Sequence, residues 1–365
     1  MITRDLTYDG LRGWLLIVIA CNHLYGSFVT QWTREPFGLV SAAEGFVFLS
    51  GFVAYLVYSK LVDQPQRLNQ KVWRRCFTIY RFHLLGILVT FSLVSLFPVY
   101  IPLWSDFFAA SNWFEQPLHS AIAATLLLEH PGFHDILILY LVPMLFLPLA
   151  IKLIKQGQAV VVAITSFSIW LIAQYISIDF ITPLFNLLLP QIKLNVSYFD
   201  PLAWQIYFYL GVLLSHLKID KACQFNFSPI IKALLLMAAA LFFMLRHWPP
   251  VELESYLTGH GSAPLLRQIN LLLMAYVLML AMRKLPQLFT LRYPVFLGQH
   301  ALSVFTFHAV VVYFLLPISQ PYTTSVWYWD VVACLFFIAL LAIPARLDQC
   351  FQQYRKKFTK NVLTI

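Results

Sequence analysis

The chain has 365 residues, of which 60% are hydrophobic and only 11% are charged, and its mean hydropathy is +0.73. Because about a quarter of the residues in a soluble globular domain are usually charged, this composition excludes a soluble protein and predicts an all-α polytopic integral membrane protein. The formal charge of +9 does not indicate nucleic-acid binding, since the basic residues lie between apolar runs and form no single patch.

Apolar runs of about 20 residues, the length that crosses a bilayer, alternate with Pro, Gly and charged residues. They predict about ten transmembrane helices, near residues 11–30, 37–58, 82–100, 134–151, 159–177, 201–217, 230–246, 264–282, 296–315 and 327–344. With a cytoplasmic N-terminus, all but four of the 25 Lys and Arg residues lie on the inner side, as the positive-inside rule requires. We therefore expect both termini in the cytoplasm and a single transmembrane domain over residues 1–365.

Ionisable residues interrupt the first two predicted spans, His23 in the first and Glu44 in the second. Such groups are costly inside a membrane and are usually functional. At about 1.5 Å of rise per residue, His23 lies roughly 18 Å from the cytoplasmic edge. Glu44 lies roughly 12 Å below the opposite edge of a core roughly 30 Å thick, which is about the same level. This depth predicts a general base and its orienting carboxylate, or a hydrogen bond that only locks two helices together.

The cytoplasmic side carries arginines that could hold a donor. Arg12 lies beside Asp9 at the entrance of the helix that carries His23, either as a simple cap or as the start of a path to His23. The predicted inner loop 59–81 is the most basic short segment, and three of its arginines could hold the phosphates of a nucleotide-like donor. They are Arg74, Arg75 and Arg81. Basic residues beside a span also set topology and attract anionic lipid of the bilayer, so both interpretations stay open.

On the outer side, the predicted loop 101–133 alternates aromatic residues with carboxylates. This pattern suits a bound sugar as well as an ordinary interfacial belt. Asp135 follows at the outer end of the fourth span and places a carboxylate near the mouth of any cavity. Trp204 and Gln205 give the sixth span a polar face at its outer end.

The ninth span repeats the pattern of the first. His308 lies roughly 18 Å from the cytoplasmic edge, at the level of His23 and Glu44, and three ionisable groups at one depth predict a shared cavity. A histidine bonded to a neighbouring carbonyl group explains His308 taken alone. The basic tail 346–365 is expected to be a cytoplasmic anchor.

Two other segments and the cysteines indicate no further chemistry. Residues 178–200 are apolar but broken by Pro183 and Pro190, which favours a re-entrant or interfacial helix. Residues 247–263 show nothing beyond a solvated outer loop. The five cysteines lack a framework or zinc-site spacing, and no phosphate-binding or dinucleotide-binding glycine motif occurs, so we expect no metal and no bound cofactor.

The opening RDLTYDGLRGWLLIVIACNHL, followed by SAAEGFVFLSGFVAYLVY, resembles the N-terminal signature of the OpgC family. That signature has an Arg-Asp, an Asp two residues before an aliphatic-Arg-Gly, an Asn-His, and an Ala-Ala-Glu followed by an apolar segment. HDILILYLVPMLFLPLA, PLAWQIYFYLG and GQHALSVFTFHAVVVY are similar to the family's later blocks. In one departure, Ser41 stands where the family usually has Asp.

This family lies within the membrane-bound acyltransferase-3 group. The resemblance implies a bacterial inner-membrane enzyme that transfers an acyl group, succinyl in the named members, to a sugar hydroxyl of a periplasmic glucan or other glycan. The donor is cytoplasmic acyl-CoA, succinyl-CoA or acetyl-CoA, as a co-substrate. The resemblance also implies that His23 is the catalytic base, that Asp9 and Arg12 are the pair on the first helix, and that Glu44 is the acidic residue of the second.

Two rival functions also fit the residues. A proton-coupled transporter, or a flippase for a lipid-linked or small anionic solute, would also have buried His and Glu, but carriers often show inverted halves, which this chain lacks. A catalytically idle assembly subunit of a glucan synthase would keep its function without His23. The residues leave open the acyl group, the acceptor and the oligomeric state. They also leave open whether transfer is direct or passes through an acyl-enzyme.

Overall fold

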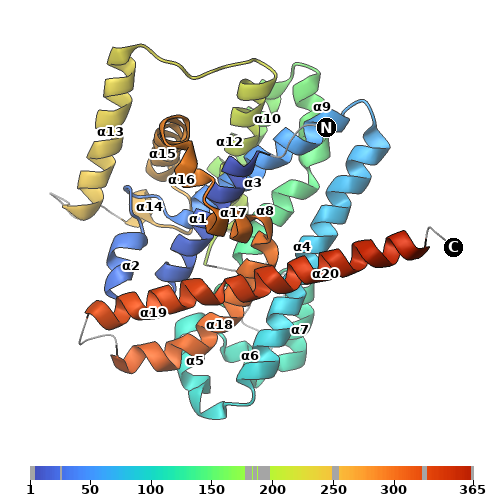
Figure 1. Ribbon diagram of the computed structural model, residues 1–365, viewed down its shortest axis with the longest axis vertical. Helices are drawn as coiled ribbons and strands as arrows, with labels where there is room; N and C mark the ends of the chain where they lie inside the picture. The colour runs from blue at the N-terminus through green and yellow to red at the C-terminus, as the bar shows by residue number, and fades with distance from the viewer. Residues whose placement is uncertain are drawn as a thin grey trace. The chain divides into compact units, whose positions relative to one another are not determined.

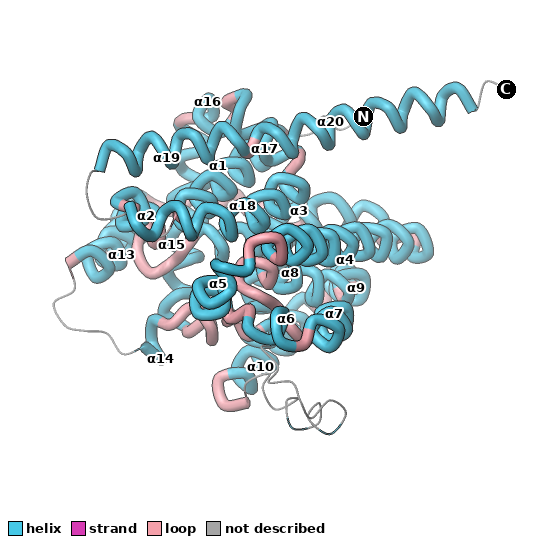
Figure 2. Tube along the Cα trace, turned by 90° about the horizontal axis from the view of Figure 1, so that it is seen from below, coloured by secondary structure: helices cyan, strands magenta, loops and turns pink. Residues whose placement is uncertain are grey.

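A computed structural model describes residues 5–24, 27–176, 183, 187, 198–248, 255–322 and 327–362. Over these ranges every regular element is a helix and no strand occurs (Figures 1 and 2), which confirms the predicted all-α fold. The chain divides into two compact units. Unit 1 comprises Met1–Arg34 and Met279–Ile365, and unit 2 comprises Glu35–Leu278. The predicted re-entrant segment 178–200 lies almost entirely outside the described residues.

Within the described residues, six helices are long and apolar enough to cross a membrane, and a bent pair would raise the number to seven. The six are α3 (Ala42–Tyr58), α4 (Pro65–Val94), α13 (Pro229–His247), α15 (Leu265–Lys284), α18 (Ala301–Tyr322) and the consecutive α19 (Trp327–Leu340) and α20 (Ala342–Val362). The bent pair is α8 (Ile136–Leu145) with α9 (Leu147–Lys155), at 48°. These helices support a membrane protein, while ten spans and two cytoplasmic termini stay predictions.

The first predicted span, 11–30, is not one helix. Asp5 starts α1 (Leu6–Asn22) by accepting a hydrogen bond from the Thr7 N–H, and α1 ends at His23. Ser27 then caps a new helix, α2 (Phe28–Thr33), by accepting from the Val29 N–H. A capping residue has non-helical backbone angles, so the chain must leave the helix before Ser27, and this break places His23 at a helix end.

The segments expected to be loops are largely helical. Pro65 lies at the start of α4, where its fixed φ favours a helix, and α4 continues to Val94, so the predicted basic loop 59–81 is mostly part of this helix. The predicted outer loop 101–133 contains three short helices, and the predicted tail 346–365 is part of α20 as far as it is described. The three short helices are α5 (Ile101–Phe108), α6 (Ser111–Glu115) and α7 (Pro117–Thr125).

The core of unit 2 forms where α3 packs against α12 (Pro201–Ile219). Gly51 lies against the Phe208 carbonyl and Gly211 against the Phe48 carbonyl, so a Cβ at either glycine would overlap the facing backbone. Small residues permit this close approach of helices. Helix α12 also contacts α8 and α10 (Ala159–Ala173), and this packing holds the start of α3, where Glu44 lies.

In unit 1, α1 packs against α17 (Arg292–Gln299). Gly13 lies directly against the Pro294 carbonyl, where no larger residue fits. The Trp14 indole N–H donates to the Leu288 carbonyl, 3.0 Å away, in α16 (Pro286–Phe289). Helices α19 and α20 follow each other along nearly one line (Figure 1). The packing around α1 holds its final turn, and therefore His23, against α18 and α19.

Candidate functional site

His23 at the end of α1 contacts His308 of α18. The two rings are stacked with centroids 4.7 Å apart and planes 23° apart, and His23 Nδ1 lies 2.7 Å from His308 Nε2. His308 is only 2% exposed, whereas His23 is half-buried. At this distance one nitrogen donates an N–H and the other accepts it, so the tautomer of one ring determines that of the other. The predicted neighbours at one depth are thus in direct contact.

Buried polar atoms without a hydrogen-bond partner lie close to this pair in the sequence. Asn22 Oδ1 and Thr306 Oγ1 are buried and have no hydrogen-bond partner among the described residues, whereas the His308 ring also interacts with the Phe305 carbonyl. Buried polar atoms in proteins are nearly always bonded, so such atoms beside a paired histidine are candidates to contact a substrate.

Asp9 and Arg12 form the ion pair that the sequence predicts on α1. The guanidinium Nη1 lies 4.0 Å from Asp9 Oδ1, and Asp9 is 5% exposed. The carboxylate lies in the first turn of α1, where a helix dipole favours negative charge. Arg12 precedes His23 by about three turns, roughly 16 Å along the axis. The pair therefore has the geometry of a helix-start ion pair, and a path from it to His23 stays a prediction.

In unit 2, Glu44 lies in the first turn of α3 and forms a capping box with Ser41. Ser41 Oγ accepts from the Ala43 N–H at 3.2 Å, and Glu44 Oε2 accepts from the Ser41 N–H at 3.0 Å. The Ser41 hydroxyl also donates to Glu44 Oε2. Ser is a strong N-cap, so Ser41 and Glu44 together fix the start of α3.

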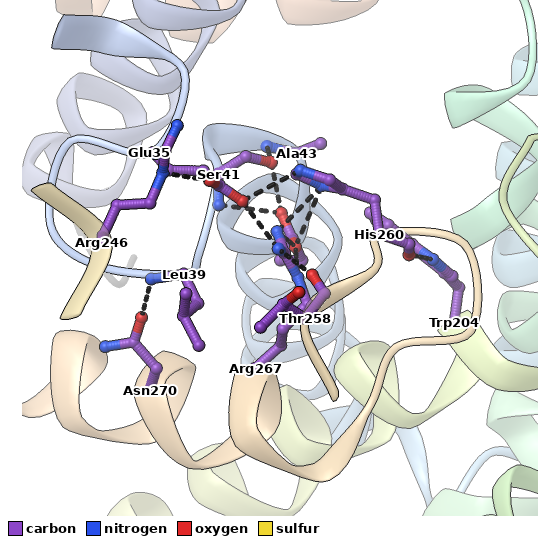
Figure 3. Close-up of polar contacts among 11 residues, drawn as sticks. Glu35, Leu39, Ser41, Ala43, Trp204, Arg246, Thr258, His260, Arg267 and Asn270 are labelled. Carbon is purple, nitrogen blue, oxygen red and sulfur yellow. Dashed lines mark hydrogen bonds and ion pairs between the residues drawn. The ribbon is translucent and has the colours of Figure 1, made fainter. Parts of the chain in front are cut away.

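The other oxygen of Glu44 is bound by Arg267 of α15. Arg267 is fully buried, and its Nε lies 2.8 Å from Glu44 Oε1, which its Nη2 also contacts. Nη1 donates to Glu35 Oε1 at 2.7 Å and to the Thr258 carbonyl at 2.9 Å, and Nη2 lies 2.9 Å from His260 Nδ1. Figure 3 shows these groups converging from the start of α3, from α15 and from the segment before α15. All three guanidinium nitrogens of Arg267 therefore form bonds within unit 2.

Glu35 completes this Arg267 cluster, which consists of Glu35, Glu44, Arg246, His260 and Arg267. Arg246 Nε lies 2.5 Å from Glu35 Oε2, and His260 Nε2 lies 2.9 Å from Glu35 Oε1. Burial raises the pKa of Glu35, but the His260 hydrogen bond and the Arg267 charge outweigh it and lower that pKa to about 2. Two carboxylates thus balance two guanidinium groups, with His260 as a hydrogen-bonding bridge.

Two further hydrogen bonds hold the segments beside the cluster. The Leu39 N–H donates to Asn270 Oδ1 at 2.7 Å, and the Trp204 indole N–H donates to the His260 carbonyl at 2.8 Å (Figure 3). The segment that leads into α3 is therefore bonded to α15, and the segment that leads into α15 is bonded to α12.

Comparison with known protein families shows to which family the chain belongs. The OpgC protein family matches residues 4–353, which is nearly the whole chain. The chain belongs to the OpgC family. This membership implies a glucan-modifying function of the acyltransferase type. Neither a curated protein nor a solved structure matches the chain.

Four residues of the Arg267 cluster in this OpgC family member were not identified from its sequence. They are Glu35, Arg246, His260 and Arg267. The prediction that residues 247–263 form only a solvated loop was wrong for His260, which bonds to two cluster members. The one local indication was Arg267 itself, since an arginine inside a predicted span normally has a partner.

Two predicted binding residues of this OpgC family member have their polar groups bonded within unit 2. The Trp204 indole donates to the His260 carbonyl, and Ser166 and Gln205 exchange two hydrogen bonds of 2.7 Å. Asp135 lies buried at the start of α8. The binding roles of these three residues stay predictions.

The predicted donor-binding arginines lie on α4. Arg74, Arg75 and Arg81 are all exposed, and the Arg81 guanidinium lies 5.8 Å from the centre of the Phe77 ring. A soluble donor could reach them. Glu44 belongs to unit 2 and His23 to unit 1, so the orienting role of Glu44 toward His23 also stays a prediction.

Proposed function

We propose that this OpgC family member is an inner-membrane O-acyltransferase that moves an acyl group from cytoplasmic acyl-CoA to a hydroxyl of a periplasmic glucan. The single observation that carries the proposal is the contact between His23 and His308 in a chain that matches the family over residues 4–353. Succinyl-CoA is the expected donor and acetyl-CoA the alternative. The proposal includes ten spans and two cytoplasmic termini.

The chemistry follows from the tautomers of the pair. If His23 Nδ1–H donates to His308 Nε2, His23 Nε2 keeps its lone pair and serves as the general base. His308 then carries its proton on Nδ1, directed toward the Phe305 carbonyl one turn earlier in α18. His308 orients His23 as a carboxylate orients the base of a catalytic triad.

In the proposed reaction, His23 takes the proton of a sugar hydroxyl as its oxygen attacks the thioester carbonyl. The new C–O bond forms and the C–S bond breaks, so the acyl group becomes a sugar ester. The leaving CoA thiolate takes up the proton that His23 gained, which restores the neutral base. Each acyl-CoA and glucan hydroxyl thus gives one ester and one free CoA.

The donor and the carboxylate have separate roles in this proposal. The exposed Arg74, Arg75 and Arg81 on α4, with Arg12 on α1, hold the phosphates of acyl-CoA by charge-assisted hydrogen bonds. Glu44 keeps a supporting role in the proposal, with its carboxylate held in a defined position by Arg267 and Ser41, while His308 makes the hydrogen bond to His23 Nδ1.

The test is the release of free CoA by the purified protein in lipid, with a glucan acceptor present. We expect turnover by the unmodified chain, its loss in His23→Ala and a reduction in Glu44→Gln. His119→Ala, a substitution in the predicted outer loop, is the matched control and should retain turnover. No turnover with any acyl-CoA would contradict the proposal and favour a carrier, and full activity of His23→Ala would favour an idle subunit.

A further inference from the structure

Four exposed lysines that the proposed mechanism does not use lie at one end of unit 2. Lys152 and Lys155 belong to the last turn of α9, and Lys218 belongs to the last turn of α12. Lys221 follows the residue that ends α12. All four are exposed. We call this set the basic rim.

The basic rim gathers around the end of α3. Lys155 Nζ lies 2.6 Å from Asp220 Oδ1, so an ion pair joins the end of α9 to the end of α12. The same ammonium group lies 5.9 Å from the centre of the Tyr55 ring, and the Lys218 ammonium lies 5.8 Å from the centre of the Phe52 ring. Phe52 and Tyr55 are one turn apart on α3, so three helix ends bring these groups together.

Asp220 is the carboxylate of this surface, and its own hydrogen bonds hold it in place. Besides the Lys155 ammonium, Asp220 accepts from the Tyr55 hydroxyl, and His216 Nδ1 lies 2.7 Å from its Oδ2. Burial raises the pKa of Asp220, but the three hydrogen bonds outweigh burial and lower that pKa. The carboxylate is therefore ionised and neutralises one of the four lysines.

The remaining charge of the basic rim is not balanced by its own segments. Among residues 147–165 and 212–228, Asp220 is the only acidic residue, whereas four residues are lysines. Three positive charges are thus left over on one small surface. Such an excess attracts an anion with more than one negatively charged or strongly accepting oxygen, and a phosphate group has this character.

The length of α12 places the basic rim at the level of lipid headgroups. The helix has 19 residues between its capping residues Asp200 and Asp220, which corresponds to roughly 30 Å. This length matches the hydrocarbon core of a bilayer, roughly 30 Å thick. A helix that crosses the core therefore brings its last turn, with the basic rim, to the surface of one leaflet. In the proposed topology this is the inner leaflet.

Exposed apolar side chains adjoin the lysines on the side of the hydrocarbon core. Leu149 lies one turn before Lys152 on α9 and is 58% exposed, and Leu217 beside Lys218 is 42% exposed. A soluble anion would make no use of these leucines. A molecule with a phosphate group and acyl chains contacts the lysines and the leucines together.

We propose that the basic rim binds the phosphate group of an anionic phospholipid, whose acyl chains lie along Leu149 and Leu217. Basic surfaces between membrane helices on the cytoplasmic side are known to hold such headgroups. The proposal goes beyond the proposed reaction and shares with it only the topology. The competing ligand is a soluble phosphate compound such as CoA, which would make the basic rim part of the donor site.

The test measures lipid binding without any acyl-CoA. Native mass spectrometry of the purified protein in neutral detergent gives the affinity for phosphatidylglycerol, with phosphatidylcholine of the same acyl chains as the uncharged comparison. We expect phosphatidylglycerol to bind more tightly. Lys152→Gln should weaken its binding about fivefold, and Lys152→Gln with Lys218→Gln about 25-fold, because each lysine near a headgroup contributes about a fivefold gain.

Two kinds of control separate the basic rim from general effects. Lys232→Gln with Lys284→Gln removes the same charge from the predicted inner ends of α13 and α15, and should change the affinity less than about twofold. Lys152→Arg with Lys218→Arg keeps the charge and should bind phosphatidylglycerol as the unmodified chain does. If the double Gln variant does not fold, Lys152→Gln with Lys221→Gln takes its place, since neither side chain contacts Asp220 or an aromatic ring in the described structure.

CoA is the probe for the competing ligand. We expect millimolar CoA to leave bound phosphatidylglycerol in place, and the double Gln variant to bind CoA as the unmodified chain does. Displacement of the lipid by CoA would overturn the proposal, as would equal binding of the two lipids or an equal loss of binding in the control variant.

The outcome is independent of whether the proposed reaction occurs. A chain that turns over no acyl-CoA but loses phosphatidylglycerol with its lysines would refute the transferase and leave the lipid site standing. Turnover by a chain whose lipid binding ignores these lysines would do the reverse.

Discussion

His23 Nδ1 lies 2.7 Å from His308 Nε2. His23 stands at the end of α1, whereas His308 lies within α18, which continues beyond it. Because α1 stops at His23, the ring leaves the helical stack and can lie flat against its partner in α18. At this distance the two imidazole rings share one N–H, so the orientation of the proposed base depends on a second histidine 285 residues away in the sequence.

Replacing His308 should impair the base without removing it. In His308→Phe the ring volume stays but the acceptor for His23 Nδ1–H is lost, and we expect CoA release to fall by about 100-fold, the lower end of general-base contributions. His308→Gln keeps a hydrogen-bonding group and should recover part of the rate. The measurement is kcat from free CoA, with His119→Phe as control. Equal rates for His308→Phe and the unmodified chain would exclude an orienting role.

Removing Arg267 should destabilise unit 2. Arg267→Met removes the guanidinium partner of the buried Glu44, and breaking a buried pair in this way costs about 3 to 5 kcal/mol. We expect a large drop in thermal stability in detergent, and a smaller one in Arg267→Met with Glu44→Met because no charge is then stranded between these two positions. The exposed Arg283→Met on the same helix is the control. A double variant as unstable as the single one would contradict this account.

The Arg267 cluster should make stability depend on pH in the acid range. The pKa of Glu35 is lowered from 4.5 to about 2 in the folded chain, so the folded state binds fewer protons than the unfolded state. The resulting stabilisation, on the order of 3 kcal/mol by linkage, is fully present above about pH 4.5 and is lost as the pH falls toward 2.

Thermal unfolding between pH 3 and pH 7 checks this dependence. The difference in unfolding temperature between the unmodified chain and Glu35→Gln should be constant near neutrality and should shrink as the pH falls below 4.5. The exposed Glu115→Gln serves as control for general acid effects. A difference that grows on acidification would have the wrong sign for an ion-paired carboxylate.

The arginines of α4 should act on donor binding alone. Arg74→Gln or Arg75→Gln removes a charge-assisted contact to phosphate at an exposed position, and we expect KM for acyl-CoA to rise about three- to tenfold with kcat unchanged. The effect should fade at high salt because exposed charges are screened. Arg67→Gln, another exposed arginine on α4, is the control. A comparable rise of KM in Arg67→Gln would indicate a general effect of charge.

The sequence by itself determined the class of fold, the family and the first candidate residues. Runs of apolar residues long enough to cross a bilayer are a local property, and they predicted an all-helical membrane protein. An ionisable residue within such a run is conspicuous for the same reason, so His23, Glu44 and His308 could be identified before any contact was known. Counting residues along two helices even placed His23 and His308 at one depth.

Only the tertiary structure decided which charges meet. Glu35 and Arg267 are 232 residues apart, and Arg246 and His260 looked like ordinary residues of an outer helix end and loop until folding placed them around Glu35. The break of α1 at His23 was equally missed, because residues 11–30 were taken as one span although the Ser27 cap lies within them. The length of an apolar run shows whether a segment partitions into a membrane, and this can be read from the sequence. A buried ion pair depends instead on the distance between two side chains, which is set by how the helices pack.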